Sequence, residues 1–516
     1  MQPITKKMYC DVAIIGGGVA GVSAAMSTTR RGLRTILLEK GTSLGGLATN
    51  GYVPQVAGMI EGNCKEMVER FAKDGEIMWR SPTDDHNPTF DPEYAKLKME
   101  HLVMEYGGRL IYDATCIDVE MDGNNIKAAI FYTKGGWMAV YAKHFIDATG
   151  DADVAALAGA PYEVGGADFA GLNMSTTLGS RWGGANMAKY QAANEAWQKE
   201  QADNGVAPEK RVSLFYDLEE KAIANGELIR HYLPFGGIVQ IRLPDCPDDN
   251  VEFTSFSFHS YFTRNTDVED ISRQIIEQHN QMMVYERFLR KYVPGYERVN
   301  LTGTGSLPGS RDSRRVFGEY MLKAADVMCG TKFEDGIARF PEMMDTHHPT
   351  SHKYVFMRHG HLPAPAGSAV TREAQCDHEM HPFGPPAGIE ARPDPGDYCD
   401  IPYRSLVPLQ VDNLLVVGRC CSAEFHANGA MRIIGPAMST GQAAGVATDF
   451  AAKKNLILRD IDGRDLRKVL IEEDGVELDK PPGGYWEELR NREGEFIVPS
   501  FMDAAIRRDP NAPPMR

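Results

Sequence analysis

Two apolar segments near the N-terminus are separated by a glycine-rich stretch and by a segment of helical length. The first is Asp11–Ile15 and the second is Arg34–Leu38. Short apolar runs without alternation are typical of strands that are buried on both faces, as in a parallel sheet. The pattern therefore predicts a strand, a helix and a second parallel strand, which together begin an α/β fold.

The pattern then becomes alternating. Residues near 91–106 have the spacing of a helix, and strand-like runs follow, separated by Asn-rich and Gly-Gly turns. These runs are Leu110–Glu120, Ile126–Thr133 and Trp137–Tyr141. A further buried strand is predicted in Phe145–Asp151, where the small residues of Ala-Thr-Gly leave room for a ligand.

Beyond about residue 166 the pattern changes again. An aromatic, β-like run covers Phe253–Phe262, a polar helix is predicted near 267–291, and many prolines follow residue 340. A buried strand returns at Asn413–Arg419. We therefore predict a Rossmann-like α/β domain with an inserted α+β substrate or cap domain. The expected divisions are 1–165 and 401–456 for the two parts of the first domain, 166–400 for the insert, and 457–516 for a C-terminal extension.

The glycine-rich stretch has the spacing Gly-x-Gly-x-x-Gly, at Gly16, Gly18 and Gly21. The first glycine permits a sharp turn, the second permits close approach of a pyrophosphate, and the third permits close helix packing. The helix N-terminus adds unpaired N–H groups and partial positive charge. Glu39, at the end of the second strand, suits two ribose hydroxyls and disfavours a 2′-phosphate. A dinucleotide site that excludes NADP is predicted.

Composition narrows the class of protein. The chain has 516 residues and a formal net charge of −16, which argues against binding to nucleic acid or to an anionic membrane. No secretory signal and no apolar run of bilayer length is recognisable. The nine cysteines lack a Cys-x-x-Cys pair, and Cys420 and Cys421 are expected to be buried thiols. A reducing cytoplasm is the expected location.

The two ends of the chain resemble the glutathione-reductase-type FAD fold, and more narrowly the FAD-dependent oxidoreductases related to fumarate reductase and succinate dehydrogenase flavoproteins. The resemblance rests on Asp11–Gly21 with Glu39, Phe145–Asp153, Ile401–Leu406 and Asn413–Gly445, and more loosely on Gly309–Arg315. It implies FAD as the cofactor. The implied cofactor-binding residues are Gly16, Gly18, Val19, Ala20, Gly21, Glu39, Lys40, Gly45, Gly46, Ala48, Thr49, Ile117, Ala148, Thr149, Gly150, Gly418, Arg419, Arg432, Pro436 and Ala437.

The segment before residue 445 carries the candidate chemistry. Gly435-Pro436 is predicted to begin a helix whose Ala437, Gly441 and Gly445 form a close-packing face. In the fold that the chain resembles, this helix N-terminus points at the flavin and stabilises negative charge on its reduced ring.

Three side chains are the candidate catalytic residues. Arg432 can bind a carboxylate or the carbonyl edge of the flavin, and a structural ion pair is the alternative. His426 resembles the histidine that holds substrate in fumarate reductases, at a longer spacing from the arginine, and is otherwise a hydrogen-bonded core residue. Arg311 is followed by Asp312 where the family has glutamate.

Histidines are crowded in residues 347–381. They are His347, His348, His352, His359, His361, His378 and His381. A polar wall of the active site, solvated loops, and a metal site that uses Cys376 with His378 and His381 are alternatives; no metal is our expectation, because paired ligand spacing is lacking.

We expect a flavoenzyme that transfers a hydride between flavin N5 and a small organic substrate, in either the oxidative or the alkene-reducing direction. Only one dinucleotide fingerprint is present, so electrons pass through the same flavin face or through an external donor or acceptor. An RNA-modifying flavoprotein and a non-catalytic FAD-binding module are the alternatives. The oligomeric state is open, with a homodimer as the default.

Overall fold

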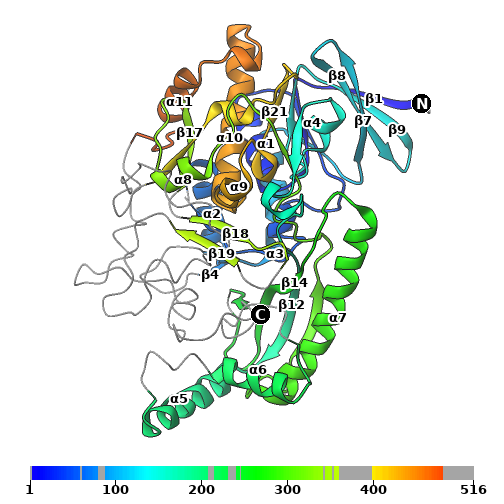
Figure 1. Cartoon of the computed structure of the whole chain (residues 1–516). Coiled ribbons are helices and arrows are strands. Elements are labelled where there is room, and N and C mark those ends of the chain that lie inside the picture. The colour runs from blue at the N-terminus through cyan, green and yellow to red at the C-terminus, as the bar shows by residue number, and fades with distance from the viewer. Residues whose placement is uncertain are drawn as a thin grey trace.

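The computed structural model describes most of the chain (Figure 1). The described residues are 3–58, 61–78, 88–206, 214–229, 240–244, 246–340, 343–350, 354–358 and 398–479.

A five-stranded parallel sheet lies at the centre of the fold, with the strand order β21-β10-β2-β3-β6. In that order the strands are Leu414–Val416, His144–Asp147, Val12–Ile15, Thr35–Leu38 and Arg109–Ile111. The predicted α/β class is confirmed. Strand β21 comes from the last quarter of the chain, yet it pairs directly with β10 and so completes the sheet that the first 150 residues begin.

Two helices pack against each other beside this sheet. Helix α1 (Val19–Arg30) follows β2, and α10 (Ile434–Lys454) lies along it (Figure 1). A Cβ atom added to Gly441 would lie 2.1 Å from the Ala20 carbonyl oxygen, and one added to Gly445 would lie 2.7 Å from that of Ala24. The small residues therefore allow the two backbones to approach closely, as the sequence predicted for this face.

A second sheet has the order β1-β9-β8-β7, made by Ile4–Tyr9, Gly136–Tyr141, Asn125–Thr133 and Thr115–Asp122. One prediction is wrong here, and one strand was not predicted. The run Leu110–Glu120 is two strands in different sheets, because Asp113 turns the chain with φ +55°. Strand β1 was not predicted, because Met8 is its one buried residue and four of the other five are exposed.

A third, antiparallel sheet has the order β13-β14-β12-β15, made by Gln240–Arg242, Val251–Ser260, Thr176–Ala185 and Asn300–Thr304. The long helix α7 (Val268–Tyr292) packs on β12 and β14, which confirms the predicted polar helix near 267–291. Trp182, Phe253 and Phe258 of the sheet share a core with Tyr285 and Phe288 of the helix. Helices α5 (Met187–Asp203) and α6 (Leu214–Ala224) extend this part of the molecule (Figure 1).

Two antiparallel pairs of strands complete the region up to residue 402. Strands β17 (Gly336–Phe340) and β20 (Cys399–Pro402) are antiparallel, as are β18 (Met343–His347) and β19 (Tyr354–Arg358). Helix α9 (Phe425–Met431) packs on β18 so closely that a Cβ atom on Gly429 would lie 2.9 Å from the backbone of Asp345.

Shorter elements connect these layers. The helices are α2 (Gly62–Lys73), α3 (Pro92–Met104), α4 (Asp153–Leu157), α8 (Ala324–Cys329) and α11 (Gly463–Glu472). The strands are β4 (Ile77–Met78), β5 (Thr89–Phe90), β11 (Tyr162–Val164) and β16 (Arg314–Val316). Helix α3 confirms the helix predicted near 91–106. Helix α11 lies in the segment that the sequence predicted to be an extension, and the proline-rich residues beyond 479 lie outside the described part.

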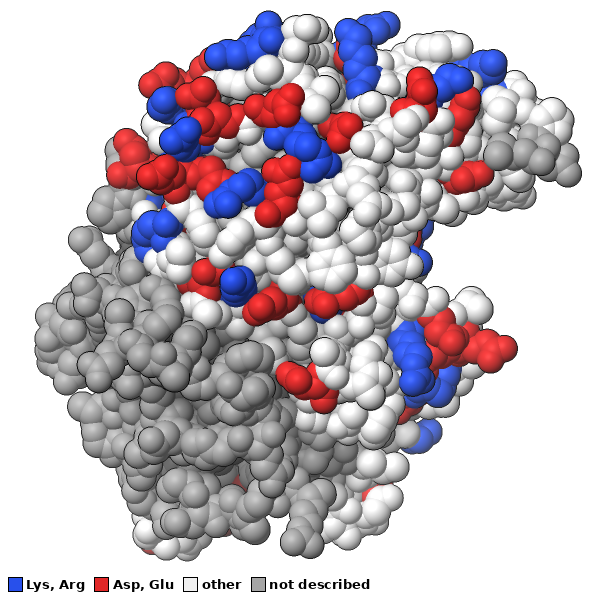
Figure 2. Space-filling model, turned by 45° about the horizontal axis from the view of Figure 1, so that its top comes forward, with Lys and Arg blue, Asp and Glu red and all other residues white. Residues whose placement is uncertain are grey.

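Acidic and basic side chains intermingle on the face of the molecule in Figure 2, among the residues that are coloured there. None of the helices within the described ranges combines the length and apolar character needed to cross a membrane.

Candidate functional site

The glycine-rich turn after β2 is shaped by contacts that leave no room for side chains at its two ends. Gly16 has φ +102°, and a Cβ atom there would lie 2.4 Å from the Ala148 carbonyl oxygen. A Cβ atom on Gly21 would lie 2.0 Å from the carbonyl oxygen of Gly16. At Gly18, by contrast, a Cβ atom would meet no protein atom within 4 Å. The chain is tightly packed on both sides of an open position, as a pyrophosphate requires.

Glu39 joins this turn to the end of β3. Its carboxylate accepts hydrogen bonds from the backbone N–H groups of Gly17 and Gly41, each at 2.6 Å. Each carboxylate oxygen has a further lone pair, so Glu39 can still accept from ribose hydroxyls. Lys40, the next residue, is exposed.

The segment 45–49 lies directly against the turn. Gly45 donates its N–H to the Gly17 carbonyl at 2.8 Å, and a Cβ atom on Gly46 would lie 3.0 Å from the Cα of Gly18. Ala48 is buried, and the hydroxyl of Thr49 donates to the Leu44 carbonyl at 2.5 Å. The glycines here allow two backbones to meet beside the open position.

The turn after β10 is held by a buried carboxylate. Asp147 accepts from the N–H and hydroxyl of Thr149, at 3.0 and 2.7 Å, and from the Ala155 N–H at 2.9 Å. Burial raises the pKa of Asp147 to about 6, although these hydrogen bonds oppose the shift. Ala148 also donates its N–H to the Ile15 carbonyl at 2.8 Å, so this turn sits beside the glycine-rich one.

Arg419 connects the same turn to Ser310, in the loop before β16. Its Nε donates to the Gly150 carbonyl at 2.7 Å, its Nη2 donates to Asp151 at 2.6 Å, and its Nη1 donates to the Ser310 carbonyl. These three contacts occupy much of the guanidinium. Arg419 therefore holds the Thr149–Gly150 turn in place by hydrogen bonds.

The first turn of α10 meets the same place. The helix begins at Ile434, so Pro436 is its third residue and not its first, which corrects the sequence prediction. A Cβ atom on Gly418 would lie 3.1 Å from the Cβ of Ala20 and 3.9 Å from that of Ala437. The starts of α1 and α10 thus converge on Gly418, although they are separated by more than 400 residues.

Most of the predicted cofactor-binding residues are therefore brought together by the fold. Ile117 is not among the residues brought together there. Its side chain packs in the second sheet, against Ala128, Ile130 and Ala139.

Arg432 caps the end of α9, two residues before α10 begins. Its Nη2 donates to the Asp345 side chain at 2.6 Å and to the Asp345 carbonyl at 2.7 Å. His347 lies on the other oxygen of the same carboxylate, with Nε2 3.0 Å from Oδ1. The buried Nε of Arg432 has no hydrogen-bond partner among the described residues. One carboxylate thus positions an arginine and a histidine side by side.

Two elements of the antiparallel region extend this cluster. The His259 ring of β14 stacks on His347 with centroids 5.6 Å apart. Arg311 approaches His259 Nε2 at 3.2 Å and donates to the Ser175 carbonyl at 2.6 Å. Arg311 and Arg432, both predicted from the sequence, therefore lie at the two ends of one group of polar side chains.

The charge states in this cluster follow from its burial. Burial and the positive charge of Arg311 lower the pKa of His347 to about 4, against the pull of Asp345. Burial opposes ionisation of Asp345, yet His347 and the Arg432 guanidinium hold its pKa well below the usual range. At neutral pH the pair is a carboxylate and a neutral imidazole.

His426 lies nearby on α9 and is 4% exposed. Its ring centroid is 5.3 Å from that of Phe425 and 6.5 Å from that of Phe169, which also contacts His348 at 5.2 Å. Its carbonyl accepts from Thr346 at 3.4 Å. These contacts place His426 in an aromatic group next to the Asp345 strand.

Other predicted histidines cannot be placed. His352, His359, His361, His378 and His381, together with Cys376, lie outside the described residues. Across the part of the chain that the structure does describe, no group of three or more histidine, cysteine or acidic residues could hold a metal ion.

Asp345 and His259 were not among the sequence predictions. Asp345 lies in a run that the sequence showed only as rich in histidine and proline, and His259 lies in an aromatic strand. Only the packing of β14, β18 and α9 brings them together, so no local sequence signal could have identified them.

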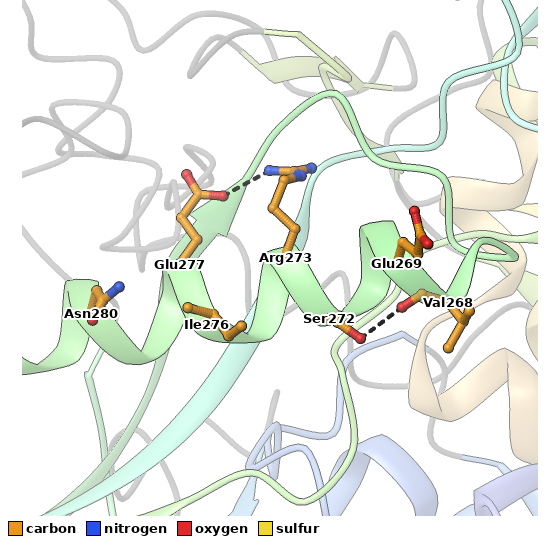
Figure 3. Close-up of a pocket in the computed structure, with 7 residues that line it drawn as sticks. All are labelled: Val268, Glu269, Ser272, Arg273, Ile276, Glu277 and Asn280. Atoms are coloured by element: carbon orange, nitrogen blue, oxygen red, sulfur yellow. Dashed lines mark hydrogen bonds and ion pairs between the residues drawn. The ribbon is translucent and has the colours of Figure 1, made fainter.

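A hollow on the surface runs along helix α7 (Figure 3). It is lined by Val268, Glu269, Ser272, Arg273, Ile276, Glu277 and Asn280. Arg273 pairs with Glu277 at 3.0 Å there, and none of the predicted site residues contributes. We do not place the reaction in this hollow.

The chain belongs to the FAD-dependent oxidoreductase family, because the model of that family, described as FAD dependent oxidoreductase, matches residues 11–470. Its cofactor is FAD. The open position at Gly18, between backbones that exclude side chains, fits that group.

Two curated proteins share part of the sequence. A mercuric reductase of Streptomyces lividans is 26% identical over 151 residues, which are 28% of this chain and 31% of the relative. A dihydrolipoyl dehydrogenase of Buchnera aphidicola is 29% identical over 100 residues, 19% of this chain and 20% of the relative. The matches thus span about a third or less of these relatives.

Solved structures with a similar arrangement are more distant. A geranylgeranyl bacteriochlorophyll reductase-like protein from Thermoplasma acidophilum is 12% identical, with 90% of this chain and 84% of that chain covered and a TM-score of 0.37. The flavin-dependent brominase Bmp2 is also 12% identical, with 91% and 84% covered and a TM-score of 0.37. Similarity at this level carries no argument about substrate.

Proposed function

We propose that this protein transfers a hydride between the N5 atom of FAD and a small organic substrate that carries a carboxylate. FAD supplies the two-electron redox chemistry when bound, and the protein binds and orients the substrate and excludes water. The residues that would hold FAD are those around the open position at Gly18: the turn from Gly16 to Gly21, the segments 45–49 and 148–150, Glu39, Gly418 and the first turn of α10.

The observation that carries the proposal is the buried Nε of Arg432, which lacks a partner among the described residues. A buried donor without an acceptor costs about 1–3 kcal/mol, so such a group is expected to bind a ligand. Both Nη2 hydrogens of Arg432 are donated to Asp345, so Nε would donate to the substrate carboxylate in a single charge-assisted hydrogen bond. Asp345 holds Arg432 in place from one side, and the substrate would bind from the other.

The position of Arg432 supports the same function. It lies two residues before α10, whose first turn converges with Gly418 and Ala20 beside the proposed cofactor position. The end of the FAD site and the start of the substrate site are thus adjacent along the chain. The resemblance of the sequence to fumarate reductase flavoproteins favours alkene reduction, and oxidation of an alcohol, amine or C–C bond is the other direction.

A reducing compartment agrees with the thiols that the structure describes. Cys420 and Cys421 are both completely buried and free, and burial raises the pKa of each well above its usual value. Thiols of this kind are inert packing residues, and they need no oxidising environment.

Flavin absorbance under anaerobic conditions tests the proposed function. The reduced protein is offered unsaturated carboxylates and enones, and the oxidised protein is offered alcohols, amines and sugars. Return of the oxidised spectrum in the first arm, or bleaching in the second, supports hydride transfer and gives its direction. A flavin that changes with no compound in either arm would favour a non-catalytic FAD-binding module.

The variant Arg432→Lys tests whether the guanidinium group of Arg432 binds the substrate. Lysine keeps the positive charge, but its single nitrogen cannot donate to Asp345 and to the substrate in the fixed geometry of Nη2 and Nε. We expect kcat/KM for a carboxylate substrate to fall by about 10- to 100-fold, which corresponds to about 1.4–2.7 kcal/mol of transition-state binding.

Arg464→Lys is the matched control for this change, because Arg464 pairs with Asp462 on the exposed helix α11. Equal activity of the Arg432 and Arg464 variants would contradict a substrate contact by Arg432.

A further inference from the structure

Helix α7 covers the antiparallel sheet with one side and exposes the other side to solvent, at the outer edge of the molecule (Figure 1). Gln278 and Met282 are buried against the sheet. On the opposite side Val268 is 76% exposed, Ile276 62% and Met283 53%. Spacings of eight and seven residues are about two helical turns each, so these three side chains form one line along the helix. Exposed apolar side chains that are grouped in this way indicate a contact surface.

A charged side chain lies near each end of this line. Glu269 follows Val268, and Arg287 lies about one turn beyond Met283. Both are exposed, and no residue that the structure describes forms an ion pair with either of them. The other charged side chains of the helix are paired: Arg273 with Asp270 and Glu277, Arg290 with Glu286, and Lys291 with Glu227.

Glu269 and Arg287 cannot pair with each other within one chain. Eighteen residues, about five full turns, separate them, so they lie on the same side of the helix about 27 Å apart. A second copy of α7 that runs in the opposite direction would bring them together. A two-fold axis perpendicular to the helix, midway between the two residues, places Glu269 of each copy beside Arg287 of the other.

The apolar side chains interleave in the same arrangement. Relative to the midpoint at residue 278, Val268 lies ten residues before, Ile276 two before and Met283 five after. The second copy has the same positions in reverse order, so apolar side chains from the two copies alternate along the contact. Neighbours are separated by three to five residues of helical rise, about 4.5–7.5 Å, which allows side chains of one helix to pack between those of the other.

The hollow in Figure 3 provides room beside this line of side chains. Val268, Glu269, Ser272 and Ile276 contribute to its lining. The long side chain of Arg287 from a second copy would enter the hollow next to Glu269.

We propose that α7 is the contact surface of a homodimer, in which two copies of the helix pack antiparallel and the ion pair between Glu269 and Arg287 forms twice. Two-fold symmetry explains why one helix carries an unpaired acid and an unpaired base at equal distances from its midpoint. A contact made by one helix from each copy is small, so we expect a Kd on the order of micromolar. None of the residues assigned to the FAD or substrate site lies on α7, and the dimer is independent of the proposed function.

Charge reversal tests the pairing of the two residues. Glu269→Arg places two arginines opposite each other in both pairs, and Arg287→Glu places two glutamates there. Each change should weaken the dimer by at least about tenfold. The FAD-loaded protein is studied by sedimentation equilibrium between about 0.1 and 100 µM, a range that brackets a micromolar Kd.

A mixture of these two variants separates pairing between copies from any other effect of the substitutions. In the mixed dimer, arginine at position 269 of one copy faces glutamate at position 287 of the other, and the unchanged Arg287 faces the unchanged Glu269. The mixture should therefore dimerise as the unmodified protein does, although each variant alone does not. The double variant Glu269→Arg/Arg287→Glu should also dimerise, because its charges are exchanged in both copies.

Ile276→Lys tests the apolar part of the contact and should abolish the dimer, because it places two like charges near the two-fold axis. Leu97→Lys is the matched control, since Leu97 is 64% exposed on α3. An unmodified protein that stays monomeric at every concentration would overturn the proposal. So would a dimer that survives Ile276→Lys and both single charge reversals, or a mixture that fails to restore the dimer. The flavin reactions that test the proposed function are unaffected by any of these results.

Discussion

The absence of a side chain at Gly18 should matter for FAD binding and not for folding. Its φ of −65° is accessible to any residue, and a methyl group there would touch no protein atom within 4 Å. We expect Gly18→Ala to change the unfolding free energy of the apoprotein by less than about 0.5 kcal/mol. The same methyl group would occupy the space beside the pyrophosphate, and FAD should bind at least about tenfold more weakly, as measured by quenching of flavin fluorescence.

Gly183→Ala is the control for this change, because a Cβ atom on Gly183 would make only ordinary contacts, at 3.5 Å. It should affect neither FAD binding nor the fold strongly. Unchanged FAD affinity in Gly18→Ala would show that the pyrophosphate lies elsewhere.

His144, at the start of β10, makes stability depend on pH. Burial, together with the charge of Lys143, lowers the pKa of His144 to about 4 in the folded protein. The unfolded chain binds a proton near pH 6.5, so the folded state loses stability as pH falls from about 6.5 to 4. The loss from this residue is up to about 3 kcal/mol, and it should be visible in urea unfolding at several pH values.

His144→Gln should remove this contribution and flatten the acid limb of the stability profile. His279→Gln, at an exposed position of α7, is the control, and its stability should fall with pH as that of the unmodified protein does, because His144 is intact. Parallel profiles for His144→Gln and the unmodified protein would contradict the assignment.

At the scale of elements, the contact between α1 and α10 depends on the absence of side chains. A Cβ atom on Gly441 would lie 2.1 Å from the Ala20 carbonyl, so the helices would have to separate. We expect Gly441→Ala to cost about 2–4 kcal/mol of unfolding free energy, even though alanine is the better helix former. Urea unfolding measures this difference.

Ala452→Gly, at an exposed position of the same helix, should cost only about 1 kcal/mol from helix propensity. A smaller loss for Gly441→Ala than for Ala452→Gly would mean that the two helices are not in such close contact.

The elements that the sequence predicted are those whose pattern is local. The strands around the glycine-rich turn are continuous apolar runs, and α7 carries a long polar pattern with Asp267 as its N-cap. Strand β1 was missed because its partner, β9, is more than 120 residues away and few of its own side chains are buried. The split of Leu110–Glu120 was missed because a positive φ at Asp113 has no signal in hydrophobicity.

At the scale of the whole molecule, the site combines segments from the two ends and the middle of the chain (Figure 1). The FAD fingerprint could be predicted from the sequence, because each of its glycines is required by the local backbone geometry. The pairing of Asp345 with Arg432 could not be predicted, because the two residues are 87 apart in the sequence and meet only where α9 packs on β18. The family follows from the sequence pattern, and the candidate substrate contacts follow only from the assembled fold.

The central claim is that Arg432 binds the carboxylate of a substrate that exchanges a hydride with FAD. The most direct test measures anaerobic bleaching of the protein-bound flavin by a 2-hydroxy acid and by its uncharged amide, and reoxidation of the reduced flavin by an unsaturated acid and by its amide. In the direction that reacts, the carboxylate should react at least about tenfold faster than its amide, and Arg432→Lys should reduce that preference. Equal rates for acid and amide in the unmodified protein would contradict the account.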